Sequence, residues 1–365
     1  MTKCKQYVAV KKTRSSNLEL YRIICMLMIV AHHYVVNSGL LLLDSPLRMF
    51  PNSINTIFLY LFGMWGKTGI NCFLMITGYY MCTSQITLRK LVKLLSQVYF
   101  YKIIIFIVFL YCGYETLSLT RVGKLLMPFW GFNDNFVGCF VAFYLLIPFL
   151  NILIRNMNKK QHQYLLFLLV LFYTILGSVP GFKITFNYIT WFSVIYLMAS
   201  YIRLYPIKIF ERRNLWGCMT FISVLLAMLS VRFLNYHFLS DSNKFFAVIV
   251  AVCSFLWFKN MKINHSRLIN AFGAGTFGVL LIHANSEAMR TWLWKDTADV
   301  IGHYFLPLGS LIVYSISVVL SVFIVCNLID QLRIATLEKW FLNWYDRKVA
   351  IKTDNWIGKI TGEKE

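Results

Sequence analysis

Long apolar runs that follow one another along the whole chain are the feature that most constrains its fold. Lipid offers no hydrogen-bond partners, so a chain that crosses a membrane forms a helix, which satisfies its own backbone polar groups. Roughly 20 apolar residues in a helix cross a hydrocarbon core about 30 Å thick. Stretches of this kind lie at 18–37, 55–81, 96–114, 136–154, 163–180, 187–202, 214–232, 244–259, 271–290 and 306–331. The sequence therefore predicts an all-α fold, a polytopic transmembrane helical bundle of about ten spans.

The composition is that of a protein that uses the bilayer as its solvent. Of the 365 residues, 58% are hydrophobic and 14% are charged, whereas a soluble domain has about 45–50% apolar and about 25% charged residues. The nine cysteines include no CxxC pair, so their spacing predicts neither a metal site nor a disulfide framework.

The basic residues indicate how the chain is oriented. If the ten stretches alternate in direction, 25 Lys and Arg residues fall on the side of the N-terminus and 8 on the opposite side. Cytoplasmic loops carry the excess of positive charge, so we expect both termini in the cytoplasm. The net charge of +21 is thereby explained by topology, and we expect the bilayer rather than nucleic acid as the partner.

Two further features concern the organisation of the chain. The stretch 55–81 contains Gly66-Lys67-Thr68-Gly69 and is expected to be broken or tilted. The polar end of the chain divides it into a membrane domain, 1–332, and a cytoplasmic tail, 333–365, with a short amphipathic interfacial helix. The apolar positions of that helix are Leu337, Trp340, Phe341 and Trp344.

Ionisable residues cluster in the first stretch, where charge is costly and often marks function. Glu19, Arg22 and His33 share one helix face, since Arg22 and His33 differ by only about 20° around the axis and by about 16 Å along it. His32 points about 80° away from Arg22. Two interpretations remain open on spacing alone: these residues line a cavity, or Arg22 extends to the headgroups and the histidines lie in the interface.

The order of these and later features resembles the acyltransferase-3 family of membrane proteins, which O-acetylate bacterial cell-envelope glycans. The family shows an acidic residue, an Arg three positions later and a His after ten more residues, matching Glu19, Arg22 and His33. A glycine- and aromatic-rich segment follows in the family. Here it reads Gly69, Phe73, Thr77, Gly78 and Tyr79.

The resemblance continues to about residue 330. A basic cluster that is usually two Arg three apart is represented by Lys90 and Lys93, with Arg89 adjacent. Phe136 stands where an aromatic pair is usual, and His283 ends a late motif. Gly69 and Gly78 also permit close helix packing, and a single membrane His is as often a packing residue as a functional one.

The resemblance implies an O-acyltransferase of a bacterial plasma membrane that uses acetyl-CoA, or another acyl-CoA, as donor substrate and has no bound cofactor. The acceptor is a sugar hydroxyl of a glycan or lipid-linked sugar. His33 is then the base or transient acyl acceptor, with Glu19 as the second catalytic residue. Acyl-CoA binding is expected at Arg22, Arg89, Lys90 and Lys93, and His283 and Phe136 are expected to support the site or bind the acceptor.

Two other functions fit the same residues. A transporter or flippase for polysaccharides or lipid-linked sugars also needs charged residues facing a cavity, but it does not need the chemistry of His33. A structural membrane scaffold needs neither Arg22 nor His33. Turnover of acetyl-CoA by the purified protein separates the enzyme from both.

Overall fold

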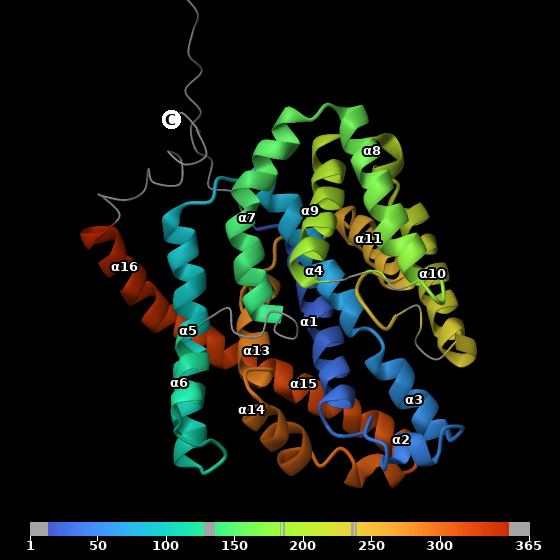
Figure 1. Cartoon of the computed structure of the whole chain (residues 1–365), viewed down its shortest axis with the longest axis vertical. Coiled ribbons are helices and arrows are strands. Elements are labelled where there is room, and N and C mark those ends of the chain that lie inside the picture. The colour runs from blue at the N-terminus through green and yellow to red at the C-terminus, as the bar shows by residue number, and fades with distance from the viewer. Residues whose placement is uncertain are drawn as a thin grey trace, which may run out of the picture.

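The computed structural model describes residues 14–127, 136–182, 184, 187–234, 237 and 239–349. Across this part of the chain the regular structure is entirely helical, as the sequence predicts (Figure 1). In chain order the helices are α1 (Ser16–Val36), α2 (Pro46–Met49), α3 (Ile54–Gly63), α4 (Gly66–Met81), α5 (Leu88–Tyr111), α6 (Leu119–Leu126), α7 (Phe136–Asn156), α8 (Lys159–Leu169), η1 (Val170–Leu176), α9 (Tyr188–Leu204), η2 (Lys208–Glu211), α10 (Arg213–Leu234), α11 (Phe245–Lys259), α12 (Arg267–Ala274), α13 (Thr276–His283), α14 (Glu287–Thr291), η3 (Trp292–Thr297), η4 (Gly302–Phe305), α15 (Leu308–Arg333), η5 (Ile334–Glu338) and α16 (Lys339–Lys348).

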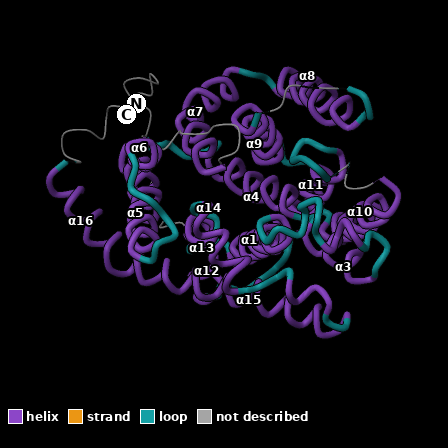
Figure 2. The backbone as a smooth tube through the Cα atoms, turned by 60° about the horizontal axis from the view of Figure 1, so that its bottom comes forward, coloured by secondary structure: helices purple, strands orange, loops and turns teal. Residues whose placement is uncertain are grey.

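Helix α1 runs through the middle of the bundle, with α3, α4, α12, α13 and α15 packed around it (Figure 2). Its apolar side chains are buried on several sides, and Cys25, Val30 and Tyr34 are fully enclosed. Close packing depends on glycine, as expected: a Cβ on Gly69 would lie 2.9 Å from the carbonyl oxygen of Cys25, and one on Gly78 would lie 2.8 Å from Ala199 of α9. Helix α1 is therefore closely packed against its neighbours on several sides.

The stretch 55–81 is broken, as predicted, into α3 and α4. Helix α3 ends at Gly63, and α4 begins again at Gly66. Gly63 lies at a helix end, where carbonyl groups lack intrahelical partners, and its carbonyl oxygen accepts a hydrogen bond from Nδ1 of His32 at 2.7 Å. A Cβ on Gly66 would lie 2.2 Å from the His32 ring, so the break fits around this side chain.

The expected number of about ten spans is not confirmed. Six helices of the described chain are long and apolar enough to cross a membrane, or seven if Arg267–His283 and Glu287–Phe305, bent by 97°, form one span. All ten expected stretches do contain helix, but α9 and α11 have only 17 and 15 residues. Fifteen residues extend about 22 Å, so α11 alone is shorter than the hydrocarbon core.

The last helix is longer than the sequence indicates. α15 continues through η5 into α16 as one helical segment of 41 residues, Leu308–Lys348, which crosses the bundle diagonally (Figure 1). Trp340 and Trp344 of the expected interfacial helix are exposed, whereas Leu342 is buried. The division into 1–332 and 333–365 stays a prediction, and residues 350–365 lie outside the described residues.

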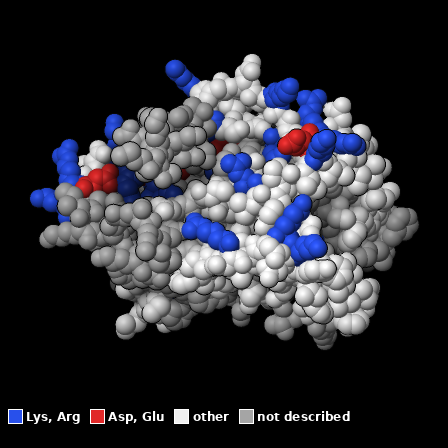
Figure 3. Space-filling view, turned by 90° about the horizontal axis from the view of Figure 1, so that it is seen from above, with Lys and Arg blue, Asp and Glu red and all other residues white. Residues whose placement is uncertain are grey.

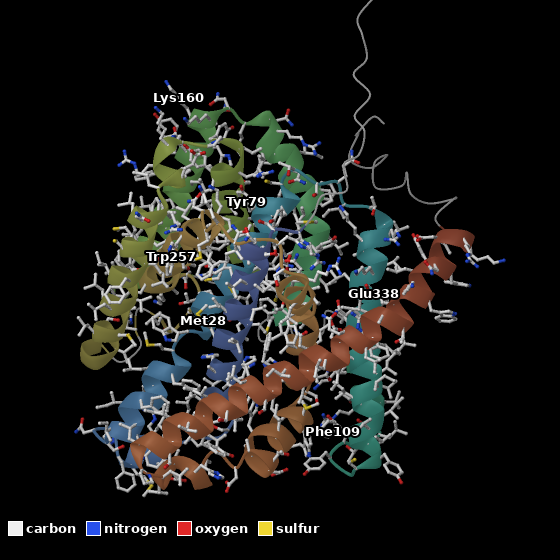
Figure 4. The ribbon with its side chains drawn as sticks, turned by 180° about the vertical axis from the view of Figure 1, so that it is seen from behind. Met28, Tyr79, Phe109, Lys160, Trp257 and Glu338 are labelled. Carbon is white, nitrogen blue, oxygen red and sulfur yellow. The ribbon has the colours of Figure 1, made fainter. Side chains whose placement is uncertain are left out.

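A buried ionic network joins this segment to α5. Arg333 bonds to Asp330 at 2.7 Å and to Glu338 at 2.8 Å. From α5, the Tyr101 hydroxyl donates to Asp330 at 2.8 Å, and Lys93 Nζ lies 2.6 Å from Glu338. Glu338 is labelled in Figure 4 close to α5. The charges satisfy one another, so burying them is tolerated.

One end of the bundle is rich in basic side chains. Seen from above, this face gathers Lys and Arg with fewer Asp and Glu (Figure 3), and Lys160 marks the same end in Figure 4. It is the end that the sequence predicts to be cytoplasmic. The first 13 residues, with four of the five basic residues of the N-terminal head, lie outside the described residues.

Candidate active site

Glu19 and Arg22 occupy the first two turns of α1. Glu19 is buried, and its Oε2 atom lies 3.9 Å from Nη1 of Arg22 and 3.6 Å from Nη1 of Arg14. The Arg22 guanidinium lies 5.8 Å from the centre of the Phe73 ring. Arg22 and His33 are separated by about 16 Å of helical rise, so Glu19 contacts the arginine and not the histidine.

His33 is paired with His283, which the sequence places 250 residues away. Nδ1 of His33 lies 2.9 Å from Nε2 of His283, and Nδ1 of His283 lies 2.6 Å from the carbonyl oxygen of Val279. His283 is fully buried and also packs edge-on against Trp294. α13 thus brings a second imidazole directly against the first.

This chain of contacts fixes which ring nitrogens carry protons. A carbonyl oxygen only accepts hydrogen bonds, so His283 Nδ1 is the donor to Val279. Neutral His283 then has a lone pair on Nε2 and accepts the bond from Nδ1–H of His33. The Nε2 atom of neutral His33 is left without a proton, which gives the site an unprotonated nitrogen with a set orientation.

His32 has a different hydrogen-bond partner from His33, although the centres of their rings are only 5.9 Å apart. Its Nδ1 donates to the Gly63 carbonyl, and its ring packs against the start of α4. Its role in the structure is to complete the end of α3. The angular separation expected from helical geometry therefore corresponds to different neighbours for His32 and His33.

His33 and its neighbour His32 both line a cavity of about 460 Å³. Seven helices contribute to its wall, namely α1, α4, α5, α7, α9, α13 and α14. Phe136 lies on the wall, in agreement with its expected place in the site, whereas His283 is not a lining residue and supports His33 from behind. Arg22 and Glu19 do not line this cavity.

Several polar residues that line the cavity are not among the site residues predicted from the sequence. They are Lys67, Lys102, Tyr188, Glu287 and Arg290. A signal was present for Lys67 and Lys102, because each is a charge inside or at the edge of an apolar stretch. Nothing in the sequence near Arg290 indicates that α14 folds back toward α1.

The basic cluster at the start of α5 is not part of the cavity. Arg89 forms two bonds to Asp346, at 2.7 and 2.9 Å, and Lys93 is bonded to Glu338 of η5. Lys90 bonds to the backbone carbonyl of Gln85. The expected acyl-CoA residues Arg89 and Lys93 are thus paired with carboxylates of the C-terminal helix. Within the described part of the chain, no three His, Cys, Asp or Glu side chains form a group that could hold a metal ion.

A helical membrane protein in which a second imidazole orients a histidine on a cavity wall has the equipment of a group-transfer enzyme. A family model described as an acyltransferase domain matches residues 15–329. The chain belongs to this acyltransferase-3 family and is a membrane acyltransferase, which decides against the transporter and the scaffold. Comparisons with curated proteins and with solved structures gave no match.

Proposed function

We propose that this acyltransferase moves an acetyl or related acyl group from cytoplasmic acyl-CoA to a sugar hydroxyl of a cell-envelope glycan, or of its lipid-linked precursor, in a bacterial plasma membrane. The observation that carries the proposal is His33, held by His283 in a single tautomer on the wall of a cavity. The family match supports acyl transfer, and the resemblance of the motifs suggests the donor and the acceptor.

The chemistry asks His33 to make a sugar hydroxyl nucleophilic. Nε2 takes the hydroxyl proton while the oxygen attacks the thioester carbon. The C–S bond then breaks, and the imidazolium returns the proton to the departing CoA thiolate. Positive charge on His33 is stabilised by the bond from its Nδ1–H to His283, and general base catalysis of this kind contributes typically 10²–10⁴-fold in rate. The same nitrogen would carry the acyl group in a covalent route.

The donor is proposed to enter from the basic end of the bundle. Arg22, Arg89, Lys90 and Lys93 would bind the CoA phosphates, and the extended pantetheine arm would span the axial distance of about 16 Å from Arg22 to His33. Glu19 would position Arg22. The Arg89–Asp346 pair is about 40% exposed on both sides and therefore weakly held, so a phosphate group can replace the carboxylate.

His33→Ala beside His32→Ala tests the proposal. Acetylation of the envelope glycan is measured by mass spectrometry in cells with equal membrane abundance of each variant. We expect His33→Ala to lose at least about 10²-fold in transfer rate, while His32→Ala keeps most activity. An active His33→Ala beside an inactive His32→Ala would reject the assignment. Absence of acetyl-CoA turnover by the purified wild-type protein would reject the reaction itself.

Labelled acyl-CoA separates the two roles that His33 can have. Incubation without acceptor leaves the label on the protein if His33 is an acyl carrier, and leaves the protein unlabelled if it is a base. We propose the base, because the fixed lone pair and the supporting His283 serve proton transfer directly.

The proposed orientation has its own test. Reporter fusions at residue 160 and at the C-terminus should lie inside the cell, and fusions at residues 45 and 120 should lie outside, because positive charge is retained in the cytoplasm. An external C-terminus would contradict an even number of spans.

A further inference from the structure

The wall of the His33 cavity carries more positive charge than the reaction at His33 requires. Lys67 of α4, Lys102 of α5 and Arg290 of α14 are lining residues, together with a single carboxylate, Glu287. These three cations come from three different helices, and they meet at the cavity that contains His33. Three cations and one carboxylate leave the cavity wall with two excess positive charges, on helices that are otherwise largely apolar.

Lys102 is the most informative of the three. It lies in the membrane-spanning helix α5, between Tyr101 and the run Ile103-Ile104-Ile105. It is half-buried, and no hydrogen-bond acceptor or carboxylate partner is present for it among the residues that the structure describes. A charge inside a span is expensive and normally paired. An ammonium group that lines a cavity without a partner is therefore suited to an anionic ligand.

Neither Lys67 nor Arg290 has a carboxylate partner at hydrogen-bonding distance among the residues that the structure describes. Lys67 donates to the Tyr188 hydroxyl at 2.6 Å, and its carboxylate neighbour, Asp241, is 3.9 Å away. The Arg290 guanidinium reaches the Ala284 carbonyl at 3.5 Å, which is beyond the usual range of a good hydrogen bond. A free guanidinium group matches the geometry of a phosphate or carboxylate, to which it can donate two bonds.

We propose that Lys67, Lys102 and Arg290 form a subsite for an anionic group, a phosphate or a carboxylate, on the acceptor glycan next to the hydroxyl that is acylated. This inference rests on the proposed function. The acyl thioester and the pantetheine arm are uncharged, and the CoA phosphates are assigned to the Arg22 end of α1. The anionic group that pairs with the cations beside His33 is therefore on the acceptor. This pairing holds the acceptor hydroxyl within reach of Nε2 of His33.

The first experiment needs no variant. The wild-type protein, purified and reconstituted in liposomes, is given acetyl-CoA and three acceptors: a neutral glycoside, the same glycoside carrying a phosphate, and the corresponding uronic acid. We expect a KM for one anionic acceptor at least about tenfold lower than that for the neutral one, because tenfold corresponds to one good charge-assisted contact. Equal KM values for all three would overturn the subsite. Absence of acyl transfer to any acceptor would instead overturn the proposed function.

The second experiment assigns the effect to residues. Lys102→Gln and Arg290→Gln should raise the KM for the anionic acceptor about tenfold or more, with the KM for acetyl-CoA unchanged. Lys102→Arg should restore binding, which a loss of folding would not allow. Lys295→Gln is the matched control, because Lys295 lies in the adjacent η3 and does not line the cavity.

Acetyl-pantetheine, which lacks the phosphates of CoA, distinguishes the remaining source of an anion. If Lys102→Gln raises the KM for acetyl-CoA but not that for acetyl-pantetheine, the cations bind the donor and the inference is wrong. If neither donor is affected while the anionic acceptor binds more weakly, the inference holds. Arg290 is exposed, so Arg290→Gln provides the same comparison in a variant that should fold normally.

Discussion

Replacing His283 by Phe tests whether the imidazole pair is part of the reaction. Phe fills a similar volume in the fully buried position beside Trp294, but it removes the acceptor for Nδ1–H of His33. The bond matters most when His33 is positively charged, and hydrogen bonds to charged groups contribute about 1.5–3 kcal/mol. That range corresponds to about 10- to 150-fold in rate. The loss should therefore be smaller than the loss for removing the base itself.

The assay is acyl transfer by the reconstituted protein, with kcat and KM for acyl-CoA determined separately. Since His283 does not line the cavity, we expect kcat to fall and KM to stay unchanged. His283→Gln is the control, because its amide oxygen can accept from Nδ1–H and should keep kcat within about fivefold, as neutral bonds differ by only ~1 kcal/mol. Wild-type kcat in His283→Phe, or equal losses in the Phe and Gln variants, would refute the role of the pair.

Three other predictions concern His32 and the basic cluster at the start of α5. His32→Ala leaves the Gly63 carbonyl without its donor and should lower stability by ~0.5–1.5 kcal/mol with little loss of transfer, as measured by thermal unfolding beside the activity assay. Gln in place of Arg89, Lys90 and Lys93 should raise the KM for acyl-CoA. The increase should be largest at low salt, because salt screens the attraction that these cations supply in the wild type. An unchanged KM at equal expression would mean that the cluster only sets topology. Asp346→Asn should act in the opposite sense and lower that KM by up to about fivefold, the strength of an exposed ion pair.

Helical periodicity was sufficient for the part of the site that lies on one helix. Spacing alone places Arg22 near Glu19, separates His33 from Arg22 along the axis, and turns His32 toward other neighbours, as the structure has them. The break before Gly66 was also accessible, because glycine and a lysine interrupt an apolar run. These inferences need only local geometry, which the sequence determines directly.

The rest depends on tertiary packing. His283 meets His33 because α13 ends beside α1, and no local pattern reports a contact across 250 residues. Arg290 reaches the cavity through a bend of 97° that an apolar run does not reveal. The number of spans also depends on tertiary packing. Hydropathy measures the length of an apolar stretch, but not how much of a stretch such as that of α11 forms a helix long enough to cross the membrane.

The network between α5 and α15 also has a consequence for the order in which the helices assemble. Within the C-terminal segment Arg333 pairs with both Asp330 and Glu338, which leaves one excess negative charge. Lys93 and the Tyr101 hydroxyl of the earlier helix α5 complete the network. A charge that is unpaired within a membrane span is costly, up to about 2.5–3.5 kcal/mol at the bilayer centre on insertion scales. During synthesis we therefore expect the last segment to enter the membrane at a lower free-energy cost when α5 is already inserted next to it. We therefore expect insertion to be coupled across more than two hundred residues, because a chain that mis-inserts α5 lacks the partner on which its C-terminal helix docks.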